Sequence, residues 1–159
     1  MLAEIEVGSA DPLDPQVAVL LAAHGAFARG ATPAAFARPL DVDALGDPTL
    51  TVICARRDGQ VLGVGALRLL DHTHGELKSM HTAAAARSQG VARAILEHLI
   101  EVARTRGCTR VSLETGTTPP FAPARRLYEA FGFVATEPFN GYPASPHTAF
   151  YTLALTPQE

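Results

Sequence analysis

Apolar and polar residues follow two different periods along this chain, and each segment of regular period predicts one element. Apolar residues recur at helical spacing in three segments, which predicts helices from residue 14 onward, from 89 to about 107, and from 122 to 131. Alternating or β-branched apolar runs predict strands at 4–7, 50–56, 61–69, 75–82, 110–115, 133–136 and 148–155. Residues 25–39 have no clean period, and a further short helix is expected at 41–45.

Turn signals join these elements into an α/β fold. Asp58-Gly59 lies between two strand segments and predicts a hairpin, so three antiparallel strands are expected in succession. The strand at 110–115 is entered from a helix and is therefore expected to run parallel to the strand at 75–82. The resulting order, β-α-α-β-β-β-α-β-α-β-β, predicts a mixed sheet, mostly antiparallel, with helices on both faces.

Length and charge limit the class of protein. The chain has 159 residues, of which 47% are hydrophobic, and this suits one soluble domain spanning residues 1–159. A net charge of -3 gives no reason to expect a nucleic-acid or membrane partner. The acidic N-terminus lacks the pattern of a signal peptide, and Cys54 and Cys108 lack metal-ligand spacing. We therefore expect a cytoplasmic protein with two buried free thiols.

The segment 87–93 joins a strand to a helix and has the chemistry of a phosphate-binding loop. The first turn of a helix carries backbone N–H groups without internal partners and a partial positive charge. Gly90 and Ala92 allow close approach of a pyrophosphate, while Arg87 and Arg93 add fork-shaped cationic donors. The lysine of a nucleotide-triphosphate loop and the glycines of a dinucleotide fingerprint are both missing, which makes another nucleotide ligand the weaker hypothesis.

Two motifs, a helix and a strand apart, resemble those of the GNAT family of N-acetyltransferases. The first is Arg87-x-x-Gly90-x-Ala92, and the second is Ala124-x-x-Leu127-Tyr128-x-x-x-Gly132-Phe133. The segments 76–80, 113–116, 121–128 and 138–142 are more narrowly similar to a YsnE-like subgroup of bacterial acetyltransferases. The resemblance implies the GNAT-type acyl-CoA N-acyltransferase fold, with one parallel pair of strands that splay apart, and acetyl-CoA as co-substrate without a metal.

The resemblance also implies direct transfer of the acetyl group to an amine, which needs a base for the ammonium and an acid for the thiolate. Tyr128 matches the tyrosine that points at the CoA sulfur in the family and is the acid candidate. Glu76 lies where the family often carries a base, and burial would raise its pKa toward neutrality. A strand-end salt bridge from Glu76 to Lys78 is the alternative interpretation, and Glu114 is the competing base.

Other residues receive expected roles from their place relative to these motifs. The strand end at 80–82 is expected to pair with the amides of the cofactor through its backbone. Phe121 stands where the family often has an asparagine that contacts the CoA arm, so contact there is expected through backbone and ring. The expected cofactor-binding residues are Met80, His81, Thr82, Arg87, Ser88, Gln89, Gly90, Val91, Ala92, Arg93, Phe121 and Tyr128.

The acceptor side is less defined by the sequence. His24, Lys78, Glu114 and Tyr142 are the expected substrate-binding residues, and the expected acceptor is a primary amine of a small molecule. A peptide or protein N-terminus, or a non-catalytic acyl-CoA sensor, are the alternatives. His72-x-His74 with Glu76 lacks a supporting second cluster, so exposed turn histidines are expected instead of a metal site. Homodimers are common in folds like this, although the chain marks no interface.

Overall fold

The computed structural model describes residues 4–31 and 47–156, and the expected helix at 41–45 lies outside these ranges. Seven strands form one sheet in the order β1-β2-β3-β4-β5-β7-β6. Their bounds are β1 Glu6–Ser9, β2 Leu50–Arg57, β3 Gln60–Leu69, β4 His74–Thr82, β5 Arg110–Gly116, β6 Val134–Ala135 and β7 Thr148–Ala154. The helices are α1 Pro15–Ala31, α2 Val91–Thr105 and α3 Ala122–Phe131, with short 3-10 turns η2 Ala84–Ala86 and η3 Pro119–Phe121.

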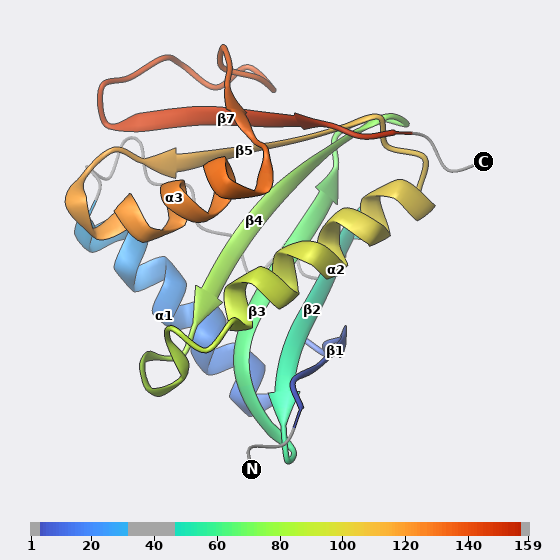
Figure 1. Ribbon diagram of the computed structural model, residues 1–159, viewed down its shortest axis with the longest axis vertical. Helices are drawn as coiled ribbons and strands as arrows, with labels where there is room; N and C mark the ends of the chain where they lie inside the picture. The colour runs from blue at the N-terminus through green and yellow to red at the C-terminus, as the bar shows by residue number, and fades with distance from the viewer. Residues whose placement is uncertain (1–3, 32–46, 157–159) are drawn as a thin grey trace.

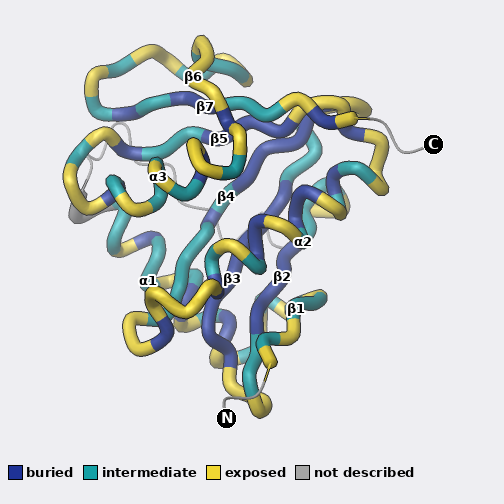
Figure 2. The backbone as a smooth tube through the Cα atoms, in the orientation of Figure 1, coloured by how far each residue is buried: buried dark blue, intermediate teal, exposed yellow. Residues whose placement is uncertain are grey.

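The helices cover both faces of the sheet, as the sequence predicts. Helices α2 and α3 lie on the face toward the viewer in Figure 1, and α1 crosses behind β3 and β4. The alternation within β2 shows the same division, because Ile53 and Ala55 belong to the core cluster under α2, whereas Val52 and Cys54 belong to the cluster that contains Val17 of α1. The central strands are therefore buried on both faces (Figure 2).

Helix α2 packs on the sheet through the apolar stripe that its sequence predicts. Its six buried residues recur at helical spacing and are Val91, Ile95, Leu96, Leu99, Ile100 and Ala103. Gly107, with φ 89°, follows the helix in the left-handed conformation that glycine adopts readily. Among the described residues, none of the helices has the length and apolar character needed to span a bilayer.

Strands β4 and β5 form the parallel pair, and they stay paired over a short distance. Three residue pairs are in register: His74 with Arg110, Gly75 with Val111, and Glu76 with Ser112. Beyond Glu76 these two strands, both described along their whole length, share no further register pair. The sheet therefore opens between the C-terminal halves of β4 and β5, where Figure 1 shows the strands diverging.

A β-bulge accompanies this opening in β4. Lys78 pairs with Ala66 and His81 with Val64, so Ser79 and Met80 together stand opposite Gly65. Ser79 has φ 57°, a left-handed value that bends the strand locally. A Cβ atom at Gly65 would approach Ile95 to 2.7 Å and the Met80 sulfur to 2.9 Å, so helix α2 packs directly on this point of the sheet.

Three local predictions need correction. The first strand covers Glu6–Ser9 instead of residues 4–7, because its register with β2 begins at the pair Glu6–Arg56. Helix α1 continues to Ala31 through a stretch without a clean apolar period. His74 was expected in an exposed turn, but it begins β4 and is buried, because its ring nitrogens bind polar side chains of β5.

Candidate active site

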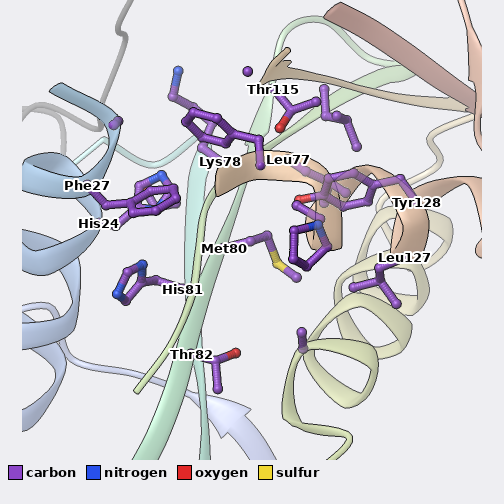
Figure 3. Close-up of a pocket in the computed structure, with 18 of the residues that line it drawn as sticks. His24, Phe27, Leu77, Lys78, Met80, His81, Thr82, Thr115, Leu127 and Tyr128 are labelled. Carbon is purple, nitrogen blue, oxygen red and sulfur yellow. The ribbon is translucent and has the colours of Figure 1, made fainter. Parts of the chain in front are cut away.

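A cavity of about 590 Å³ occupies the opening between β4 and β5 and extends to the start of α2. Figure 3 shows side chains entering it from α1, β4 and α3. The cavity brings together most of the residues that the sequence singles out: His24, Glu76, Lys78, Met80, His81, Thr82, Arg87, Ser88, Gly90, Val91, Ala92, Arg93, Glu114, Phe121 and Tyr128. Gln89 and Tyr142 are not among its lining residues.

The end of the cavity at α2 has the features of an anion site. Helix α2 begins at Val91, and its N-cap Gly90 has φ 83° and makes no side-chain capping hydrogen bond. The first N–H groups of the helix therefore keep their donor capacity and the positive end of the helix dipole. Arg87 and Arg93 both line this end, although Arg93 is also paired with Glu97 at 3.1 Å on the exposed side of the helix.

Gln89 braces the loop before α2 from outside the cavity. Its amide oxygen accepts a hydrogen bond from Arg57 at 2.8 Å, and its amide nitrogen donates to the carbonyl of Ala85 at 3.1 Å. The side chain thus ties the loop to β2 and to η2. The Gln89 side chain therefore has a bracing position, and cofactor contact at this residue stays a prediction.

Glu76 lies at the base of the opening and is 2% exposed. Lys78 Nζ lies 3.8 Å from its Oε2 atom, and the Tyr142 hydroxyl donates to its Oε1 atom at 3.2 Å. Burial raises the pKa of the Glu76 carboxyl above its ordinary value, and the nearby ammonium of Lys78 opposes that rise. Glu76 is therefore paired with Lys78 and is also a carboxyl of raised pKa that faces the cavity.

Tyr128 enters the cavity from α3 on the side opposite α1 (Figure 3). Its ring packs edge-on against Phe133, with ring centroids 5.7 Å apart. Burial raises the pKa of its phenol to about 12, so the hydroxyl keeps its proton at neutral pH. A protonated phenol at a cavity wall can donate a hydrogen bond into the cavity.

The wall formed by α1 and η3 is aromatic. The rings of Phe27 and Phe121 meet edge-to-face with centroids 5.0 Å apart, and His81 contacts both Phe27 and His24. Burial lowers the pKa of His24 to about 4, so this imidazole is neutral at pH 7. Sequence reasoning missed Phe27, although it follows His24 by three residues and so shares its face of the helix.

Several other lining residues were missed because their neighbours in space are far away in the sequence. Thr148 comes from β7 and reaches the cavity through its pairing with Gly116 of β5. Its hydroxyl is buried without a hydrogen-bond partner among the described residues. A lone threonine at the start of a strand carries no pattern that would mark it. The remaining missed residues include Leu77, Leu113, Thr115, Ala124 and Leu127.

Comparison with known proteins identifies the family. The family model of the acetyltransferase (GNAT) family matches residues 22–133, which is more than half of the chain. The uncharacterized N-acetyltransferase YedL of Escherichia coli (strain K12) is 42% identical over 145 residues, 91% of either chain. The uncharacterized N-acetyltransferase YsnE of Bacillus subtilis (strain 168) is 46% identical over 116 residues, 73% of this chain and 77% of YsnE.

Solved structures agree with the fold. A candidate acyl-CoA N-acyltransferase of Klebsiella pneumoniae superposes with a TM-score of 0.82 at 26% identity, covering 96% of this chain and 98% of that one. The fold also matches yncA of Salmonella typhimurium, solved with its cofactor acetyl-CoA, with a TM-score of 0.66 at 22% identity, covering 96% and 94%. The chain therefore belongs to the GNAT acetyltransferase family and is an acyltransferase, which confirms the family and the fold predicted from its two motifs.

Proposed function

We propose that this protein transfers the acetyl group of acetyl-CoA to a primary amine of a small molecule, with Glu76 as base and Tyr128 as acid. The observation that carries the proposal is the single cavity that connects a helix N-terminus, an open strand edge, a buried carboxylate and a buried phenol. Acetyl-CoA, when bound, supplies the activated acetyl thioester.

The described residues fit this co-substrate from one end to the other. Arg87, Arg93 and the uncapped start of α2 offer donors to the pyrophosphate. The C-terminal half of β4 has backbone groups without a partner from β5 and offers them to the amides of the pantetheine arm. A relative solved with acetyl-CoA bound has the same fold.

The proton transfers of the reaction are then shared between Glu76 on β4 and Tyr128 on α3. An ammonium has no lone pair, so Glu76 accepts its proton and leaves the neutral amine free to form the new C–N bond at the acetyl carbon. As the C–S bond breaks, Tyr128 donates its proton to the departing sulfur. The second proton, which the nitrogen loses as it becomes an amide, restores the phenol, and Glu76 returns its own proton to solvent. Burial raises the pKa of the Glu76 carboxyl and so makes it a better base, and Tyr128 carries its proton at neutral pH.

The charges of the cavity favour an amine acceptor. The two lining arginines, Arg87 and Arg93, flank the start of α2, while Glu76 and Glu114 lie on β4 and β5 on the far side of the strand opening. With Lys78 included, the carboxylate end holds two carboxylates and one ammonium, so it attracts an ammonium, and the arginine end attracts a pyrophosphate. The aromatic wall of α1 and η3 offers apolar surface to the carbon skeleton of a small acceptor.

The test is release of free CoA thiol from acetyl-CoA in the presence of a panel of amines, with Tyr128→Phe as the variant. We expect kcat to fall on the order of 10²-fold while the Kd for acetyl-CoA stays within a factor of about two. Tyr151→Phe is the matched control, because this buried phenol donates to Glu129 at 3.0 Å and does not line the cavity. An acetyl-CoA-binding protein that releases no thiol with any amine would instead support the sensor hypothesis.

A further inference from the structure

The loop after β6 packs its aromatic rings on the face of the sheet that carries His74 and Glu76. Phe139 meets His74, Tyr142 and Phe150 edge-to-face, with ring centroids 5.7, 5.5 and 5.7 Å apart. Tyr142 also stacks on Phe150, with centroids 6.5 Å apart and planes inclined by 26°. These contacts fix the loop against the sheet directly over the strand that carries Glu76.

The histidine beneath this loop is held in one orientation and one tautomer. A guanidinium only donates, so the contact of Arg110 with His74 Nδ1 at 3.1 Å makes Nδ1 the acceptor. The Nε2–H group then donates to Ser112 Oγ at 2.7 Å, and the Ser112 hydroxyl lies 3.0 Å from Thr152 Oγ1. His74 therefore serves as a fixed platform for Phe139, and it does not activate Ser112 as a nucleophile.

Tyr142 extends from this anchored loop to the carboxylate. Its hydroxyl donates to Glu76 Oε1 at 3.2 Å, while Lys78 approaches the other oxygen, Oε2, at 3.8 Å. The carboxylate is thus held on both oxygens by protein groups. Tyr142 itself is not among the residues that line the cavity, although Glu76 is.

We propose that Tyr142 is a positioning residue for Glu76, which holds the carboxylate toward the cavity and favours its ionised form, and that it does not contact the acceptor. This inference rests on the proposed function, because it takes Glu76 as the base. It also replaces the substrate-binding role that the sequence suggests for Tyr142.

The charged groups around Glu76 determine the direction of the expected effect. Lys78 on the same strand, Arg68 on β3 and the Tyr142 hydroxyl each lower the pKa of the Glu76 carboxyl, whereas Glu114 on β5 and, above all, burial raise it. The effect of burial is the largest of these, so the pKa of the Glu76 carboxyl is raised overall. Loss of the Tyr142 hydroxyl removes one of the opposing contributions and raises the pKa further.

The experiment is the pH dependence of kcat/KM in Tyr142→Phe, which deletes the hydroxyl and keeps the ring contacts. We expect the midpoint of the acidic limb to move up by about half a unit to one unit, the equivalent of one hydrogen bond. The KM for acetyl-CoA should stay unchanged. Tyr151→Phe, which removes the phenol that binds Glu129 at 3.0 Å, is the control and should leave the midpoint in place.

Four outcomes separate the possible roles. A uniform loss of kcat/KM, with the midpoint unmoved both in kinetics and in the NMR titration described next, would overturn the inference in favour of packing alone. A raised KM for the amine, with both midpoints unmoved, would overturn it in favour of acceptor contact. A carboxyl ¹³C NMR titration, with the Glu76 resonance assigned through Glu76→Gln, tests the same pKa change without turnover; an unmoved Glu76 midpoint there also overturns it. If the NMR midpoint moves and the kinetic midpoint does not, positioning holds and the base assignment fails.

Discussion

Replacement of Gly116 by alanine tests how the aromatic wall of the cavity is built. Gly116 ends β5, and the ring of Phe121 lies directly on its Cα. A Cβ atom at this position would lie 2.1 Å from Phe121 Cδ2 and 2.3 Å from Cε2, well inside contact distance. The backbone at Gly116 is not in the left-handed region, so alanine can adopt the same backbone conformation without strain. The expected clash is therefore between the added methyl group and the ring of Phe121.

The size of the effect follows from overpacking. The ring of Phe121 is 9% exposed and packed against Phe27, so it has little room to retreat. Overpacking of this kind costs about 1–3 kcal/mol of the free energy of unfolding. For a chain of 159 residues we expect Tm to fall by roughly 2–12 °C. Gly8→Ala is the matched control in the same sheet, because a Cβ there meets nothing within 4 Å, and we expect no loss of stability.

A double-mutant cycle with Phe121→Ala isolates the contact. The single change Phe121→Ala should cost about 3–5 kcal/mol through the lost ring. Once the ring is gone, Gly116→Ala has no clash to create, so the double variant should be more stable than the sum of the single variants by about 1–3 kcal/mol. Urea denaturation of the four proteins measures this coupling. Additive effects, to within about 0.5 kcal/mol, would refute the argument.

Two further predictions concern residues that act on the site from its margins. Gln89→Ala removes two hydrogen bonds that hold the loop before α2. The Kd for acetyl-CoA, measured by calorimetry, should therefore rise about two- to tenfold. An unchanged Kd would show that the loop keeps its shape without these hydrogen bonds. The pKa of His24 is lowered to about 4 by burial, so the unfolded chain binds a proton first as the pH falls below about 6.5, and stability is lost on acidification. At pH 5 this loss amounts to about 2 kcal/mol relative to pH 7, and His24→Gln should remove it in urea titrations at the two pH values; an equal loss in both proteins would contradict this assignment.

The sequence predicts the elements well where periodicity and turn chemistry agree. Helix α2 has a stripe of six buried residues and a glycine after its end, and the structure confirms it. The parallel pairing of β4 with β5 follows from the helix that joins them and is confirmed as well. Strand β1 was placed two residues early, because four residues of alternating sequence fit either register and pairing with β2 decides between them.

The site was predictable where a motif identifies it and less so where the fold alone assembles it. Arg87, Gly90 and Tyr128 belong to local motifs, and all three line the cavity. Phe27 and Thr148 come from segments distant in sequence, and their contribution depends on how α1 and β7 pack. The burial of His74 was also missed, since the polar partners that allow it lie on β5.

The short pairing of β4 with β5 gives the sheet an edge in its interior. Strand edges offer rows of unpaired N–H and C=O groups that pair readily with another chain, and proteins normally place them at the periphery or cover them. Here the edge of β4 beyond Glu76 faces a cavity of about 590 Å³. A ligand lying along that edge completes the sheet. A ligand that paired with this edge would therefore do more than bind: it would cover the part of the sheet most open to pairing with another chain.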